Sequence, residues 1–344
     1  MSSHSKTFRE GDFIENRDKL IFDVKGMLHP PDRVIAFLRY YPSSIGGRER
    51  GGIRYEKVYS LVERFSILKS KAPSYVYFDK VLGSVMQGVP VGDVQRLYQP
   101  IEKLMEMSAA RGNLDPVQRQ SLDFCELLSK SAGIALNKLG VTGSILVGLH
   151  GKDSDIDVIV YGTRSCSSVY RAIGSLYSDS ESQVRAYTKD ELEKLFRFRA
   201  SDTYTEWESF LRTESRRRLQ GIFRGRDYFL RFIKDWGEVP GHYGDAVYSS
   251  LGKATIRAKV IDDTESLFTP CSYKVRDTRF VSEENHNQAP IGEICSFRGR
   301  FCEIARREEY VTGRGKLELV SYKSGDSHTR LVVGEDKEDF LTLL

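Results

Sequence analysis

The sequence predicts an α+β protein in three parts. Before residue 96, Gly and Pro clusters separate short apolar runs, which is typical of strands and turns. From there to about 240, apolar residues recur at helical spacing around one buried-strand pattern. Beyond that point, alternating segments are separated by Gly, Asn, Asp and Ser. We therefore expect an N-terminal α/β part (1–95), a mixed-sheet core with flanking helices (96–240) and a small β-barrel-like domain (241–344).

Composition excludes several classes of protein. The 52 basic and 48 acidic residues give a formal charge of +4, too mild to indicate a polyanion partner without local basic patches. The five cysteines form no CxxC pair, which predicts reduced thiols. The N-terminus carries no apolar signal core, and no stretch is long enough to span a bilayer, so we expect a cytoplasmic protein without a membrane partner. The sequence leaves the oligomeric state open.

The first part contains one clear pair of strands. The runs RVIAFLRYYP (33–42) and GIRYEKVYSL (52–61) resemble the two arms of a hairpin. Between them lies the Gly/Arg-rich segment SSIGGRERGG (43–52), which cannot be helical. We expect it to form an exposed, positively charged loop.

The second part alternates helices with strands. Helices are predicted at 94–112 and at 116–140, the second with Asp115-Pro116 as its start and Gly140 as its stop. Further helices are expected at 165–178, 189–200 and 205–220, and a strand at 225–236. The last part should form strands within 255–262, 293–305, 315–323 and 329–335, with a barrel or sandwich as the result.

The stretch GVTGSILVGLHGKDSDIDVIVYG (140–162) carries the chemistry. We interpret 141–146 as a strand, 147–154 as a Gly-rich turn and 155–162 as the neighbouring strand. Side chains alternate along a strand, so Asp155 and Asp157 point the same way while Ile156 enters the opposite layer. Two neighbouring carboxylates repel each other unless a divalent cation lies between them, and Mg²⁺ prefers such oxygen ligands.

The glycines and the serine of this stretch suit a phosphate. Gly143 would allow a phosphate to approach backbone N–H groups, and the hydroxyl of Ser144 adds a donor. Gly148 keeps the turn open. Together with the two carboxylates, these residues predict a triphosphate site beside one or two metal ions.

The motif resembles that of the DNA polymerase β-like nucleotidyltransferase superfamily. The family pattern GSxxxG followed by DSDID is matched at Gly143, Ser144, Gly148 and 153–157. The segments FDVKGMLHPPDRVIAFLRY and SFRGRFCEIARREE also resemble uncharacterised archaeal proteins described as predicted nucleotidyltransferases. The resemblance implies Mg²⁺-dependent transfer of a nucleoside monophosphate from an NTP, ATP first among them, to an acceptor hydroxyl, with Mn²⁺ as an alternative metal.

The resemblance also implies roles for particular residues. Asp155 and Asp157 would hold a two-ion metal site, and a third carboxylate is expected on a later strand. Asp227 is the preferred candidate, with Asp235 and Asp262 as alternatives. The nucleotide-binding set would comprise Gly143, Ser144, Gly148, Lys152, Arg224 and Arg226. An RNA 3′ end is the first candidate acceptor, while protein side chains and small hydroxylated molecules stay open.

Simpler interpretations stand beside these. A DSD sequence also occurs in solvated turns, and Lys152 and His150 could be ordinary loop residues. The run Arg216–Arg218, placed on the predicted helix 205–220, cannot share one helix face, so part of it should be solvated. If no third carboxylate reaches the metals, the protein would be a catalytically inactive nucleotide- or RNA-binding protein that retains the fold. A protein-interaction module without nucleotide affinity is a third possibility.

Overall fold

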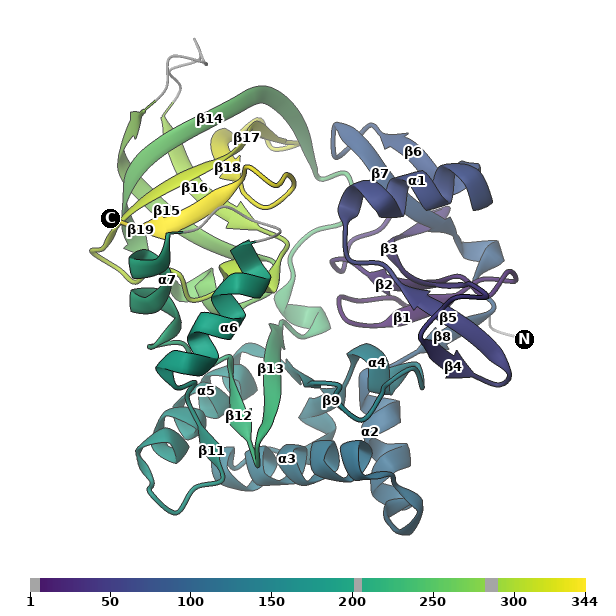
Figure 1. Cartoon of the computed structure of the whole chain (residues 1–344). Helices are drawn as coiled ribbons and strands as arrows, with labels where there is room; N and C mark the ends of the chain where they lie inside the picture. The colour runs from purple at the N-terminus through teal and green to yellow at the C-terminus, as the bar shows by residue number, and fades with distance from the viewer. Residues whose placement is uncertain (1–6, 201–205, 282–289) are drawn as a thin grey trace. The chain divides into compact units, whose positions relative to one another are not determined.

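The computed structural model describes residues 7–200, 206–281 and 290–344 (Figure 1). The chain forms two compact units from interleaved segments. The first unit comprises residues up to 78, 85–169 and 233–243, and the second comprises 79–84, 170–232 and 244–344. The predicted division into three consecutive domains stays a prediction.

The first unit begins with an antiparallel sheet. Its strands follow the order β4-β5-β3-β2-β1-β8, and β7 also pairs with β3 and with β6. The predicted hairpin of β3 and β5 is confirmed, with Tyr40 opposite Lys57. The elements are β1 (Phe13–Glu15), β2 (Ile21–Val24), β3 (Arg33–Pro42), β4 (Arg48–Arg50), β5 (Ile53–Lys57), α1 (Leu61–Lys71), β6 (Val76–Asp79), β7 (Ser84–Pro90) and β8 (Arg96–Tyr98).

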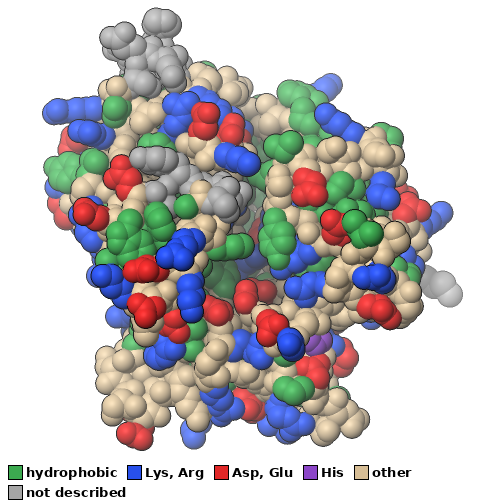
Figure 2. All heavy atoms as spheres, in the orientation of Figure 1, with side chains coloured by type: hydrophobic (Ala, Val, Ile, Leu, Met, Phe, Trp, Pro, Cys, Tyr) green, Lys and Arg blue, Asp and Glu red, His purple; other side chains and the backbone are tan. Residues whose placement is uncertain are grey.

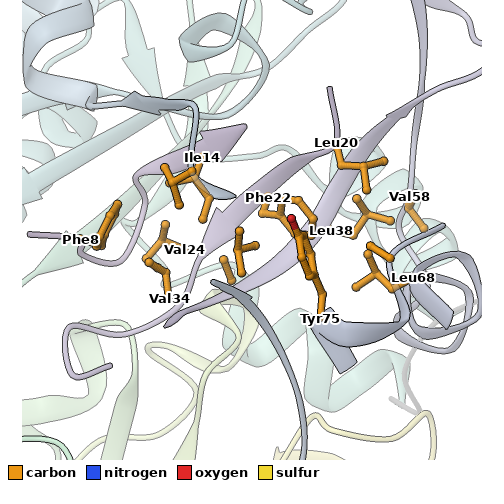
Figure 3. Packing of buried hydrophobic residues seen from close by; sticks show 14 residues of the cluster. Phe8, Ile14, Leu20, Phe22, Val24, Val34, Leu38, Val58, Leu68 and Tyr75 are labelled. Carbon is orange, nitrogen blue, oxygen red and sulfur yellow. The ribbon is translucent and has the colours of Figure 1, made fainter. Parts of the chain in front are cut away.

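Apolar residues cover both faces of this sheet. On one face, side chains from the strands meet Leu68 of α1 and the ring of Tyr75 in a hydrophobic layer (Figure 3). On the other face, Tyr40, Tyr55 and Tyr98 contact Leu146 and Leu149 of the motif stretch. The N-terminal sheet therefore packs directly against the motif stretch. Burial of apolar side chains on both faces of the sheet stabilises this packing.

The rest of the first unit holds the motif between helices. It comprises α2 (Pro100–Ala109), α3 (Pro116–Ala132), β9 (Leu139–Val141), α4 (Gly143–Leu146), β10 (Ile156–Tyr161) and the start of α5 (Thr163–Ser178). β9 and β10 pair antiparallel, with Val141 opposite Val158. The carbonyl of Ile233, the last residue of β13, accepts a hydrogen bond from the Gly162 amide.

Three sequence predictions in this region were wrong. The helix expected at 94–112 starts only at Pro100, since the residue before a proline is driven to extended geometry and Gln99 adopts it. The helix expected at 116–140 ends at Ala132, because Gly133 takes a left-handed conformation (φ 62°) that caps it. The strand expected at 141–146 is only β9 up to Val141. The chain turns at Gly143 into the short helix α4, whose Leu146 joins the apolar layer under the sheet.

The second unit contains a smaller α/β part. It comprises the end of α5, β11 (Val184–Arg185), α6 (Lys189–Ala200), α7 (Trp207–Glu214), β12 (Gln220–Phe223) and β13 (Arg226–Ile233) up to 232. β12 pairs antiparallel with β11 and with β13. The predicted strand at 225–236 is confirmed as β13.

The helix expected at 205–220 ends at Glu214, and of the run Arg216–Arg218 that follows it only Arg217 is fully buried, while its neighbours are half-buried. Arg216, Arg217 and Arg218 follow α7. Arg217 is fully buried and donates to Glu214 at 2.8 Å, while Arg216 pairs with Glu309 at 2.5 Å. Burying such charges requires partners, and these carboxylates supply them. The basic run is therefore part of the packing of the second unit.

The predicted C-terminal barrel is confirmed. Five strands close on themselves in the order β14-β15-β16-β18-β17, with β14 pairing to β17 and β16 running parallel to β18. The sequence did not predict β15, and the expected strand 293–305 stops at Ser296. The elements are β14 (Ala246–Asp262), β15 (Cys271–Phe280), β16 (Ile291–Ser296), β17 (Tyr310–Tyr322), β18 (Ser327–Val332) and an added edge strand β19 (Phe340–Leu343).

Charge and thiols follow the expectations from composition. Figure 2 shows basic and acidic side chains mixed over the visible face. All five cysteines are free and buried. Across the described ranges, no helix is long and apolar enough to cross a membrane.

Candidate active site

The motif lies where two antiparallel strands of the first unit meet. Gly143 follows β9 after one residue, Thr142, and Asp157 lies at the beginning of β10. The Thr142 amide donates to the Asp157 carbonyl at 2.9 Å, and the Thr142 hydroxyl donates to the Gly11 carbonyl at 2.8 Å. These bonds fix the start of the glycine-serine turn against the carboxylate strand.

Gly143 and Asp157 are in direct contact. Gly143 has a φ of 66°, a conformation that favours glycine, and a Cβ built there would lie 2.1 Å from the Asp157 Oδ2 atom. Any larger residue would displace the carboxylate. The first glycine of the motif is therefore required by the close approach of Asp157 as well as by the turn.

The two carboxylates alternate with buried residues as expected. Asp155 is exposed and Asp157 half-buried, while Ile156 and Val158 are fully buried. Since successive side chains of a strand point to opposite faces, both carboxylates lie on the more open face. Ser144 is buried beneath the turn, and its carbonyl accepts a hydrogen bond from the Leu149 amide at 2.9 Å.

Two arginines of β4 hold the turn that follows. Arg48 donates to the Leu149 carbonyl at 2.5 Å and to the Ser154 hydroxyl at 3.3 Å. Arg50 donates to the Val147 carbonyl at 2.9 Å and pairs with Glu15 at 2.6 Å. The prediction that 43–52 forms an exposed, positively charged loop was therefore wrong for these two arginines. The segment includes β4 and the turn to β5, and most of its residues are exposed, but Arg48 and Arg50 are partly buried because they donate to carbonyls of the motif turn.

Glu15 completes the support of Arg50. Burial acts to raise the pKa of Glu15, but hydrogen bonds from Tyr98 and Arg50 outweigh it and hold the pKa below its usual value. The carboxylate therefore stays ionised. Gly148 lies exposed beside this arginine with a φ of 67°, as an open turn requires.

The charge of Asp157 acts on two groups of the N-terminal sheet, Lys57 and Tyr40, which sequence reasoning missed. Burial and the positive charge of Arg39 lower the pKa of Lys57, and the negative charge of Asp157 partly opposes this. Burial raises the pKa of Tyr40 to about 12, a rise that Arg39 and Arg48 oppose and Asp157 supports. The strands β3 and β5 thus bring basic side chains into the electrostatic field of the motif carboxylate.

An exposed aromatic ring accompanies these cations. The Lys57 ammonium lies 4.8 Å and the Arg39 guanidinium 5.2 Å from the centre of the Tyr59 ring, which is 57% exposed. Basic and aromatic residues interleave in the sequence around 39–41 and 55–59. That pattern was the available signal, but about 100 residues separate it from the motif.

The remaining predicted residues are distributed over both units. His150 contacts Asp115, the N-cap of α3, at 2.8 Å, and Lys152 is an exposed residue of the turn. Arg224 and Arg226 lie in the second unit at the β12–β13 turn, where Arg224 donates to Gln183 at 2.5 Å. Asp227 is an exposed residue of β13 in the same unit, and its role as third carboxylate stays a prediction.

Of the two alternatives to Asp227, Asp235 can be set aside. A Cβ built at Gly162 would lie 2.8 Å from the Asp235 Oδ2 atom, which also binds Lys138 at 2.7 Å. Gly162 follows the end of β10, whereas Asp155 precedes its start, and six strand residues span about 20 Å. Asp155 and Asp235 therefore lie too far apart to share a metal ion. Asp262 lies in the barrel, 3.8 Å from Lys274.

The carboxylate pair fits a magnesium ion that substrate phosphates also bind. Within the described ranges, no three His, Cys, Asp or Glu side chains gather as a metal site. Mg²⁺ is commonly held by one or two carboxylates together with water and phosphate oxygens. Asp155 and Asp157, on the open face of β10, offer that donor set.

The structure places a glycine-serine turn after one strand and two carboxylates at the start of its neighbour, which is the arrangement that the motif predicts for a nucleotidyltransferase site. Comparison with known proteins agrees, because residues 122–248 match the nucleotidyltransferase domain family. The chain is also 30% identical over 337 residues to an uncharacterised protein of Methanocaldococcus jannaschii, with 96% of each chain covered. No solved structure matches. The chain therefore belongs to the nucleotidyltransferase domain family.

Proposed function

We propose that the protein transfers a nucleoside monophosphate from an NTP to an acceptor hydroxyl and releases pyrophosphate. The contact between Gly143 and Asp157 supports this most strongly, because it joins the phosphate-binding turn to the carboxylate pair. Family membership supports nucleotidyl transfer in general. ATP is the first nucleotide to test, and an RNA 3′ end is the first acceptor.

Asp155 and Asp157 would hold Mg²⁺, or Mn²⁺ in its place, with Asp227 as the third carboxylate. Bound there, the metal would lower the pKa of the acceptor hydroxyl and neutralise charge on the leaving pyrophosphate. The amides after Gly143 and the turn through Gly148 would lie along the triphosphate, and Ser144 would donate to it. Lys152, Arg224 and Arg226 would contribute positive charge to phosphate binding.

Arg39 and Lys57 of the N-terminal sheet would add to these phosphate-binding cations. A triphosphate carries several negative charges, and cations fixed near Asp157 would offset both its charge and that of the carboxylates. Partial burial lowers the pKa of Lys57, and an anionic ligand would reverse that effect. Tyr59, exposed between the two cations, offers a ring on which a base can stack.

The test uses each α-³²P-labelled NTP with Mg²⁺ and total RNA, comparing the wild type with Asp157→Asn. We expect transfer to fall at least about 100-fold in the variant, with the fold intact by circular dichroism. The matched control is Asp190→Asn, an exposed aspartate in the first turn of α6. Wild-type turnover by Asp157→Asn would refute the assignment. NTP binding without transfer by the wild type would instead indicate an inactive nucleotide-binding protein.

A further inference from the structure

The outer face of the barrel places like charges directly opposite each other. Where β14 pairs with β15, Arg257 lies opposite Arg279 and Lys259 lies opposite Arg276. Arg257, Arg276 and Arg279 are exposed. Like charges opposite each other on neighbouring strands destabilise a sheet. A chain selected only for the stability of its barrel would not concentrate cations in this register.

A second like-charge pair in the same barrel is neutralised by acidic side chains. Lys253 lies opposite Lys316 where β14 pairs with β17. Asp336 binds Lys253 at 2.5 Å, while Glu318 and Glu335 bind Lys316 at 2.7 and 2.9 Å. Around Arg257 and Arg279, in contrast, no carboxylate among the described residues lies within 4 Å of either guanidinium. Among the described residues, acids therefore neutralise the lysine pair and leave the arginine pair without an acidic partner.

Each of the three cations next to this pair has an acidic partner at the surface. Lys259 pairs with Glu308 at 2.6 Å, Arg276 lies 3.5 Å from Asp277, and Lys274 lies 3.8 Å from Asp262. The side chains of these acids are at least 41% exposed, and ion pairs with an exposed partner contribute little free energy. Five cations therefore line one face of two neighbouring strands, and a ligand can replace the acids that three of them bind.

An exposed aromatic residue lies at the edge of this cation face. Tyr310 of β17 is 54% exposed and lies opposite Lys259, whose ammonium is 5.7 Å from the centre of its ring. Cations alone would bind any polyanion, whereas a ring among them can also stack on an unpaired base. A duplex offers no such base, so the combination favours a single strand.

We propose that this face, formed by Arg257, Lys259, Lys274, Arg276, Arg279 and Tyr310, binds single-stranded RNA. Residues 274–279 of β15 span about 17 Å, which accommodates a few nucleotides. The strand order of the barrel is also that of OB-folds, several of which bind single strands, although topology by itself does not define a ligand. The proposal goes beyond nucleotidyl transfer, because binding here needs neither metal nor NTP.

The test measures anisotropy of a fluorescein-labelled single-stranded RNA 20-mer with the full-length protein, in EDTA and without NTP. The variant is Arg257→Thr/Arg279→Thr, which keeps strand propensity. We expect affinity to fall about 10-fold or more in low salt, and the slope of log affinity against log salt to become shallower by about 1.4, two phosphate contacts at roughly 0.7 each. The melting temperature should stay the same or rise, since repulsion is removed.

The matched control is Lys253→Thr/Lys316→Thr, which removes the like-charge pair that acids neutralise and should leave RNA affinity unchanged. Equal affinity and slope in the arginine variant would overturn the proposal, as would binding of an acidic polyglutamate peptide in preference to RNA. A lower melting temperature of the arginine variant would also overturn it, because the chain's own carboxylates would then neutralise the pair. Loss of transfer in Asp157→Asn with RNA binding retained would separate this surface from the active site.

Discussion

Cations collect in two regions of this protein, and they are held in different ways. Around Asp157, Arg48 and Arg50 are tied to backbone carbonyls of the motif turn, and Lys57 is buried enough for its pKa to fall. On the barrel, Arg257 and Arg279 are exposed and face each other across two strands. The first set is fixed by the fold, whereas the second is free to adjust.

This difference indicates two kinds of ligand. Fixed, partly buried cations favour a compact anion that fits their positions, because the cost of their desolvation is met before the ligand arrives. Exposed cations along strands suit an extended polyanion, whose binding releases counterions and weakens steeply with salt. We therefore expect NTP binding to depend on salt less than RNA binding does.

The largest effect is expected at the contact that fixes the active site. Gly143→Ala would place a Cβ 2.1 Å from the Asp157 Oδ2 atom, at a φ of 66° that residues with a side chain rarely adopt. We expect transfer to fall about 100-fold or more because the carboxylate must move, with a loss of roughly 1–3 kcal/mol in the free energy of unfolding. The measurements are labelled-NTP transfer and thermal unfolding.

Gly151→Ala is the matched control for this variant, since a Cβ there meets no atom within 4 Å. Its activity should equal that of the wild type. RNA binding to the barrel should survive in both variants. Equal transfer by Gly143→Ala would mean that the position of Asp157 is not critical, and the contrast between a fixed and an adjustable region would fail.

A smaller effect is expected for the cation on β5. Lys57→Met keeps the length of the side chain and removes its charge, so NTP affinity should fall about 10-fold or more by equilibrium dialysis. The fold should be equally stable or more stable, because a lysine with a lowered pKa opposes folding while it is charged. Reduced affinity together with reduced stability would point to a structural role instead.

The same lysine predicts a pH dependence. Phosphate binding needs the charged ammonium, and burial, then Arg39, lower the Lys57 pKa in the folded protein. NTP affinity should therefore be full below this lowered pKa and decrease as the pH rises through it. Folding responds in the opposite sense, since the unfolded chain binds the proton more tightly and stability rises with pH in that window. Lys57→Met should abolish both dependences, which titrations above neutral pH can establish.

The sequence predicted local chemistry better than long-range assembly. The sequence alone singled out Asp155, Asp157 and Gly143, because their spacing is short and their residue types are unusual in a buried strand, and their role as site residues stays a prediction. Arg39 and Lys57 were missed, since only the pairing of β3 with β5 and the packing of that sheet under Leu146 bring them near the motif. Arg48 and Arg50 were assigned to solvent for the same reason.

Element boundaries failed where tertiary contacts overrule local preference. Residues 141–146 have the apolar composition of a strand, but Gly143 turns the chain and burial of Leu146 stabilises a helical turn. β15 was not expected because charged residues alternate along it, and its inner positions alone show the barrel pattern. The same charged positions form the proposed RNA-binding face, so residues placed there for function lower the local propensity for a strand.

The smallest effect is expected for the aromatic residue of the RNA-binding face on the barrel. Tyr310→Ala should weaken single-stranded RNA binding about fivefold, at the lower end for one stacked base, because the ring is only partly exposed. Since no charge is removed, the salt slope should stay at the wild-type value, unlike that of Arg257→Thr/Arg279→Thr. Tyr322→Ala, an exposed tyrosine at the other end of β17, is the control and should bind normally. A changed slope with Tyr310→Ala would mean that the ring positions the cations, so the two kinds of contact would not be separable on this face.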